Sequence, residues 1–119
     1  MIEYIRTSKV EAKDRRMRYI TTVVCFYSDH YAARNPSITY GHSVSTHEFY
    51  NPEQGVEIAR ERGWLQRLSG KKRGLCGEIG SRVYHMEWLE KNRKIRKAYV
   101  DRIHESFCKN INNFIWQTK

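Results

Sequence analysis

The chain has 119 residues, of which 39% are hydrophobic and 13% are aromatic. This length and composition predict a single domain, 1–119, that buries a core without disulfides or a structural metal, and they exclude a disordered tail. The 22 Lys and Arg against 13 Asp and Glu give a formal charge of +9, a surplus that favours phosphate-bearing partners.

The three cysteines, Cys25, Cys76 and Cys108, are odd in number and form no CxxC pair. Such a count without a secretory signal argues against a disulfide framework, so we expect free thiols and a cytoplasmic location. The first residues have no signal-peptide pattern, and the longest apolar run is too short to span a bilayer. The sequence therefore predicts no membrane partner.

The first part of the chain, about residues 1–50, has the composition of a sheet. Tyr19–Tyr27 is β-branched and aromatic throughout, which predicts a buried strand. Ser37–Thr46 predicts a second strand, with Gly41 as a bulge or twist point, and Asn35-Pro36 signals a turn between the two. Ile2–Ile5 could add an edge strand.

Residues 8–18 are compatible with two structures. Ser8 and Glu11 fit a capping box, which favours a short helix over about residues 9–16. The same segment could instead form a hairpin with the strand that follows. The sequence alone leaves both open.

The second part, about residues 51–119, has the pattern of helices. Asn51-Pro52-Glu53 combines an N-cap, a first-turn proline and an acidic residue, which predicts a helix that continues to about residue 69, with Gly63 as a weak point. A glycine-rich loop over residues 70–80 precedes a long helix whose apolar residues recur every four positions. These residues are Ile95, Tyr99, Ile103, Phe107 and Ile111.

This spacing of four drifts by about 40° per step on an ideal helix, so the apolar face is broad. The helix is therefore expected to be buried on more than one side, or to share its Ile95–Phe114 face with a second subunit in a homo-oligomer. The expected fold class is α+β, with a small antiparallel sheet from the N-terminal half packed against C-terminal helices.

Cations cluster in residues 70–99, which carry nine basic side chains against three acidic ones. The glycine-rich loop can bring backbone N–H groups close to an anion, and the helix after it can lie along phosphates. A smaller arginine cluster before the first long strand could extend this surface. The expected phosphate contacts are Lys71, Lys72, Arg73, Lys91, Arg93, Lys94, Lys97, Arg15, Arg16 and Arg18, and the expected base-stacking side chains are Trp88 and Tyr99.

A metal site is not predicted. His104 and Cys108 stand four residues apart on the last helix, and Cys76 and His85 could complete a tetrahedral set. No pair among them has the spacing of a zinc finger or ribbon, so no metal or other cofactor is expected.

Catalytic motifs are missing as well. The glycine-rich loop lacks the Gly-Lys-Ser or Gly-Lys-Thr ending of a P-loop, which argues against nucleoside triphosphatase activity. His42 and His47 lie in a polar strand without the repeated HxT/S pattern of two-histidine phosphoesterases. The sequence favours a non-enzymatic protein.

Three hypotheses follow, led by an accessory protein that binds nucleic acid through its basic loop and helix. The second is a binder that sequesters a nucleotide or cyclic nucleotide in a closed pocket. The third is a protein-interaction module that inhibits an acidic partner, whose signature would be an exposed apolar patch on the last helix. The small size would suit a phage or mobile-element gene. The sequence does not choose among DNA, RNA, nucleotide and acidic protein.

Overall fold

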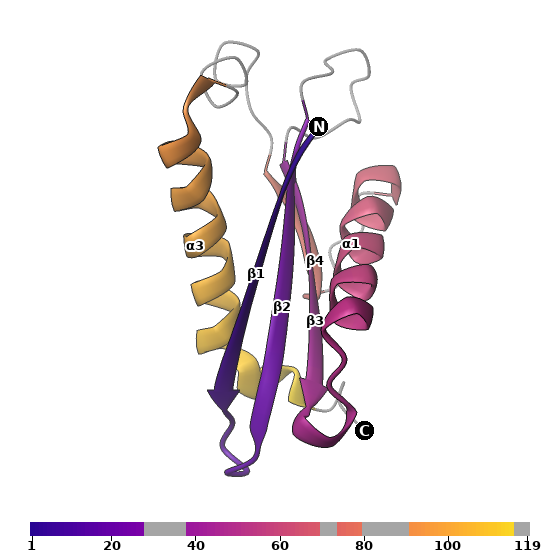
Figure 1. The fold of residues 1–119 in the computed structure, drawn as a ribbon, viewed down its shortest axis with the longest axis vertical. Coiled ribbons are helices and arrows are strands. Elements are labelled where there is room, and N and C mark those ends of the chain that lie inside the picture. The colour runs from indigo at the N-terminus through magenta and orange to yellow at the C-terminus, as the bar shows by residue number, and fades with distance from the viewer. Residues whose placement is uncertain (28–37, 70–73, 80–90, 116–119) are drawn as a thin grey trace.

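The computed structural model describes residues 1–27, 38–69, 74–79 and 91–115. Its elements form three layers, with a four-stranded antiparallel sheet between helix α1 on one face and helix α3 on the other (Figure 1). The predicted α+β class is confirmed, and the sheet comes largely from the N-terminal half of the chain. Among the described residues, no helix is both long and apolar enough to cross a membrane.

The sheet has the simplest strand order, in which each strand pairs with the next along the chain. The central strand β2 is buried along almost its whole length, because a helix covers each face of the sheet. Even-numbered residues of β2 and β3 face α3, and odd-numbered residues face α1. The strands are β1 Ile2–Glu11, β2 Met17–Phe26, β3 Ile38–Thr46 and β4 Cys76–Ile79.

Strand β4 lies where the sequence predicted a continuous loop over residues 70–80, so that prediction is wrong for residues 76–79. Gly77 pairs with Tyr40 of β3. A Cβ atom on Gly77 would lie 2.3 Å from the Tyr40 hydroxyl oxygen, so only glycine lets this ring lie across the strand. The glycine here serves packing against β3 and does not free the backbone for an anion.

Residues 8–18 form the hairpin and not the helix. Strand β1 continues to Glu11, and Ser8 pairs with Ile20 of β2. A capping box would satisfy only two backbone N–H groups, whereas pairing with β2 satisfies a ladder of ten residues on each strand. The hairpin turns through a loop in which Arg15 adopts a φ of 64°.

Both long helices begin at an asparagine cap. Helix α1 spans Pro52–Ser69, and the Asn51 side chain accepts a hydrogen bond from the backbone N–H of Gln54 at 3.1 Å, as the sequence predicted. Helix α3 spans Arg93–Lys109, and Asn92 caps it through the N–H of Ile95. Two 3-10 helices, η1 at His47–Phe49 and η2 at Ile111–Asn113, follow β3 and α3.

The apolar residues at every fourth position of α3 face the sheet. Ile95, Tyr99 and Ile103 pack against a buried cluster that includes Val24 and Ile38. The chain's own sheet therefore occupies the face that the spacing also suggested for a second subunit. A second cluster continues the core toward the hairpin end and consists of Ile20, Leu75, Phe107 and Ile111.

Helix α1 approaches β3 at two glycines. Gly41 lies in regular pairing with Val23, so it is not the bulge that the sequence suggested as one alternative. A Cβ atom on Gly41 would lie 2.0 Å from the Ala59 carbonyl oxygen and 2.7 Å from the Gly63 nitrogen. Gly41 is therefore required because the backbone of α1 lies directly against that of β3.

Replacing Gly41 with alanine should force α1 off the sheet, because a backbone oxygen cannot yield as a flexible side chain can. We expect G41A to lower the free energy of unfolding by about 3 kcal/mol or more. The matched control is G63A, whose Cβ would meet nothing closer than 3.5 Å and whose alanine favours the helix by about 1 kcal/mol. Urea denaturation of both variants checks this, and equal stability of the two would contradict the packing.

Candidate functional site

Helix α3 presents cations on the side that faces away from the sheet. Its sequence contains six basic residues and two carboxylates. One cation, Arg96, is buried, and its Nε donates a hydrogen bond to the Tyr4 hydroxyl at 3.0 Å. The five that are exposed are Arg93, Lys94, Lys97, Arg102 and Lys109.

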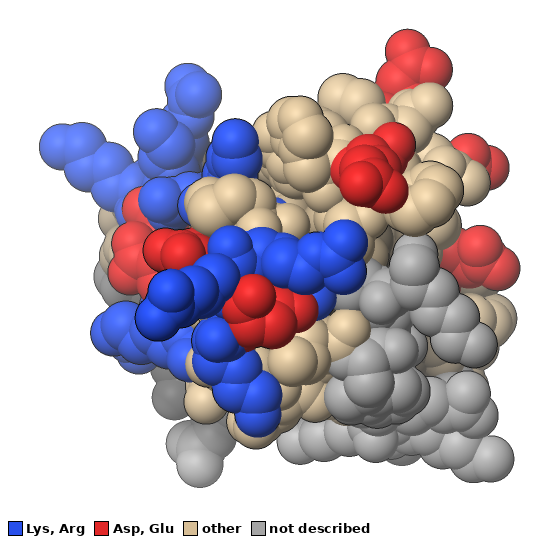
Figure 2. All heavy atoms as spheres, turned by 90° about the horizontal axis from the view of Figure 1, so that it is seen from below, with Lys and Arg blue, Asp and Glu red and all other residues tan. Residues whose placement is uncertain are grey.

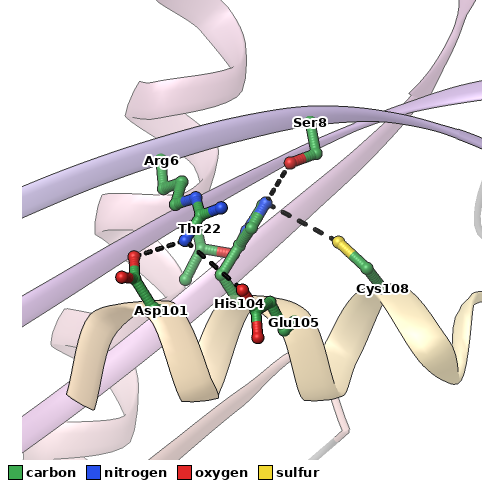
Figure 3. Close-up of polar contacts among 7 residues, drawn as sticks. All are labelled: Arg6, Ser8, Thr22, Asp101, His104, Glu105 and Cys108. Carbon is green, nitrogen blue, oxygen red and sulfur yellow. Dashed lines mark hydrogen bonds and ion pairs between the residues drawn. The ribbon is translucent and has the colours of Figure 1, made fainter. Parts of the chain in front are cut away.

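The two carboxylates of α3 are engaged by a residue from β1. Arg6 forms an ion pair with Asp101, and its Nη1 lies 3.8 Å from Glu105 (Figure 3). Within the described part of the chain, the five exposed cations of α3 form no ion pair of their own. The outer side of α3 therefore carries uncompensated positive charge.

The turn of the β1–β2 hairpin adds three exposed cations, Lys13, Arg15 and Arg16. This turn lies beside the end of α3, because the backbone N–H of Lys13 donates to Asn112 Oδ1 of η2 at 2.7 Å. The side chains of the turn and the five of α3 are here called the basic face. Its members are Lys13, Arg15, Arg16, Arg93, Lys94, Lys97, Arg102 and Lys109.

Figure 2 shows this distribution from the hairpin end of the molecule. Lys and Arg gather on the α3 side, with a few carboxylates among them, whereas the described surface on the α1 side shows carboxylates without basic neighbours. Helix α1 itself contains three acidic and three basic residues. Among the described residues, charge is thus distributed unevenly between the two sides of the sheet.

The predicted phosphate contacts divide into four groups, one of which is Arg15 and Arg16, exposed in the hairpin turn. Lys91, just before α3, is exposed, and so are Arg93, Lys94 and Lys97 in the first turns of the helix. The start of α3 lies at the end of the molecule opposite the hairpin turn (Figure 1). Arg18 is buried and forms an ion pair with Asp14 at 2.7 Å, so its guanidinium is already engaged within the hairpin. Lys71, Lys72 and Arg73 lie outside the described residues.

Neither predicted base-stacking residue is seen as an exposed ring on the basic face. Tyr99 is half-buried and packs against the core beneath α3. Trp88 lies outside the described residues. One aromatic stack lies at the hairpin end, where the rings of Tyr19 and Tyr50 lie 4.0 Å apart and His47 stacks on Tyr19. Nothing in the spacing of these three residues had indicated it.

A buried polar network lies under α3, and Figure 3 shows part of it. Thr22 Oγ1 lies 2.7 Å from His104 Nδ1 and 2.8 Å from His42 Nδ1. On its other side, His104 Nε2 lies 2.6 Å from Ser8 Oγ and 3.6 Å from Cys108 Sγ. One hydroxyl donates only one hydrogen, so Thr22 donates to one imidazole and accepts from the other.

Burial keeps both imidazoles of this network neutral. It lowers the pKa of His42 from 6.5 to about 3, and the charges of His104 and Arg62 act in the same direction. Burial also lowers the pKa of His104, with Arg6 contributing. Burial raises the pKa of the Cys108 thiol, so this cysteine is not a ready thiolate. The network is suited to hydrogen bonding and not to holding charge.

The alternative metal set is divided between the two faces of the sheet. Cys76 Sγ donates to Gln66 Oε1 of α1 at 3.4 Å, whereas His104 and Cys108 lie on the α3 face. His85 lies outside the described residues. In the described ranges, no three His, Cys, Asp or Glu side chains come together as metal ligands.

No protein-family model, curated protein or solved structure matches the chain. The assignment of a function therefore depends on the geometry and charge of its own residues.

The buried histidines should make the fold sensitive to mild acid. In the unfolded chain a histidine gains its proton near pH 6.5, whereas folded His42 stays neutral until about pH 3. The unfolded state therefore binds more protons as the pH falls between these values, and stability present above pH 6.5 is lost. For His42 alone we expect a loss of about 2 kcal/mol between pH 7.5 and pH 5.

Urea denaturation at the two pH values measures this loss. The carboxylates with lowered pKa values, Glu3 and Asp14, titrate only at lower pH, so they do not account for a loss of stability between pH 7.5 and pH 5. An unfolding free energy that stayed constant or rose on acidification would contradict the assignment of neutral buried imidazoles.

Proposed function

We propose that the protein binds nucleic acid without catalysis, by contacts between the basic face and backbone phosphates. The observation that carries this proposal is the set of eight exposed cations, five on α3 and three in the hairpin turn beside its end, that form no ion pair within the described residues. The nearest acidic residues of α3 are already engaged by Arg6. A polyanion would supply the missing counter-charge.

The start of α3 carries positive charge, which is unfavourable for the stability of the helix. Its first turn contains Arg93 and Lys94 and no acidic residue. Positive charge near a helix N-terminus opposes the macrodipole, which costs about 0.3–1 kcal/mol for each side chain. A phosphate at this end would reverse that cost, because it interacts favourably with both the cations and the dipole.

Arg15 supports the same proposal from the other end of the basic face. The loop Lys13–Arg15 ends in a left-handed residue, with Arg15 at φ 64°, a position that hairpins of this length usually give to glycine. An L-residue there costs about 1–2 kcal/mol. A cation at a position that favours glycine is consistent with selection for charge at the turn.

The dimensions suit a strand of nucleic acid. Helix α3 has 17 residues, so it is about 25 Å long at 1.5 Å per residue. That length corresponds to about seven phosphates along one strand of a duplex at 3.4 Å each. Contacts between these cations and backbone phosphates carry no sequence information, so the expected binding is independent of sequence and weakened by salt.

The inhibitor hypothesis finds less support. Its expected signature was an apolar patch exposed on the last helix, yet no large hydrophobic side chain of α3 is exposed. The exposed apolar residues of the helices, Trp64, Leu65 and Leu68, lie on α1 instead. They lie on the opposite side of the sheet from the basic face.

The triple variant R93Q/K94Q/K97Q should weaken binding to a mixed-sequence duplex and flatten its salt dependence. We expect the slope of log K against log salt to fall in magnitude by up to about 3, because three phosphate contacts are lost. The fold should not suffer, since the substitutions relieve the helix dipole. The control is R60Q on α1, which removes an exposed cation paired with Glu3. An equal loss of affinity in R60Q would refute the basic face.

The variant R15G separates function from stability. We expect it to raise the free energy of unfolding by about 1 kcal/mol, because glycine adopts positive φ without strain, while it weakens duplex binding by the loss of one cation. The measurements are urea denaturation and fluorescence anisotropy with a labelled duplex. Unchanged binding in a stabilised R15G would show that the turn does not contact the nucleic acid.

A further inference from the structure

A cavity of about 390 Å³ opens between α3 and the β3 side of the sheet. Its lining combines polar side chains with three aromatic rings, those of Tyr40 of β3, Phe107 of α3 and Phe114 beyond η2. A volume of this size is within the range of small-ligand pockets, and aromatic walls suit a planar ring. The basic face does not by itself account for such a cavity.

His42 contributes a polar atom to this cavity. The side chain is 98% buried in β3, being 2% exposed, and its ring stacks on Phe107 with centroids 3.9 Å apart. Nδ1 is taken by Thr22, whereas Nε2 forms no hydrogen bond within the described chain. Because His42 lines the cavity and Nδ1 points to β2, the ring offers Nε2 to a ligand.

The hydrogen-bonded network determines whether His42 Nε2 is a donor or an acceptor toward the cavity. When Ser8 donates to His104 Nε2, His104 donates from Nδ1 to Thr22, and Thr22 in turn donates to His42 Nδ1. His42 then carries its hydrogen on Nε2, as a donor toward the cavity. Nε2 has no partner within the described chain, so a ligand acceptor at this point would complete the hydrogen bonding of the ring.

The rim of the cavity joins it to the basic face. Arg102 belongs to both, since it lines the cavity and is one of the exposed cations of α3 without an ion pair. Ser106 and Asn110 line the same rim and can donate or accept hydrogen bonds. A planar ring with polar edges, attached to a phosphate, matches this order of groups.

We propose that the cavity receives the base of an unpaired nucleotide, with His42 Nε2 at the base edge and Arg102 at its phosphate. This inference rests on the proposed function and refines it, because it makes a single strand the preferred ligand over a duplex. A free mononucleotide carries the same chemistry, so the experiment distinguishes it from a nucleotide within a strand.

The test measures the affinity of the wild type for three ligands at one salt concentration. These are a single-stranded oligonucleotide, a duplex with the same number of phosphates, and a free nucleoside monophosphate. We expect the single strand to bind about tenfold more tightly than the duplex, in line with the gain from one stacked base. Tight binding of the monophosphate alone would identify a free nucleotide, and not a nucleotide within a strand, as the ligand of the cavity.

Two variants of α3 provide the comparison. S106L narrows the cavity, and its control A98L places a leucine at an exposed position of the same helix that does not line the cavity. We expect S106L to lose the single-strand preference and keep duplex binding, with A98L unchanged. If S106L retained the preference, the cavity proposal would fall and the basic face would stand. If no polyanion bound the wild type, the proposed function would fall first.

A second measurement does not depend on any substitution. The ring nitrogens of His42 give separate ¹⁵N resonances, and Nε2 should shift when the preferred ligand is added because it gains a hydrogen-bond acceptor. A titration that saturates binding and leaves the Nε2 resonance unmoved would overturn the assignment of His42 to the base.

Discussion

The hydroxyl of Thr22 holds the α3 side of the molecule together. It lies at the middle of the central strand and contacts His104 of α3 and His42 of β3, while Ser8 of β1 contacts the far nitrogen of His104. One polar chain thus crosses three strands and a helix. Apolar packing could tolerate rotation of α3, whereas a bonded buried network fixes it. That fixed rotation turns the exposed cations outward and places His42 against the cavity.

The two sides of the sheet differ in packing and in charge. Helix α1 lies close enough to β3 that Gly41 allows no side chain, and its charges balance. Helix α3 has exposed cations on its outer side, and its inner side packs on a core that includes the neutral buried histidines. Uncompensated charge at the start of α3 and a left-handed Arg15 both oppose stability. Such costs are expected where function and not folding selects the residue.

Periodicity and caps were enough to predict the sheet-forming part, both long helices and the α+β class. Strand β4 was missed because four residues acquire their strand conformation from pairing with β3 and not from a pattern of their own. The surplus charge was visible in the sequence, but the burial of Arg96 depends on a tertiary partner, Tyr4, and that of Arg18 on a hairpin turn that the sequence left undecided. The contact between His42 and His104 through Thr22 joins residues far apart in the chain, so no local spacing could reveal it.

The central claim is that phosphate contacts come from the α3 side of the sheet. Backbone amide chemical shifts, followed by NMR while an oligonucleotide is added at low salt, test it most directly. The account predicts that perturbations concentrate in α3 and in the hairpin turn, with α1 unaffected. Shifts that centred on α1, or that spread evenly over both helices, would contradict it.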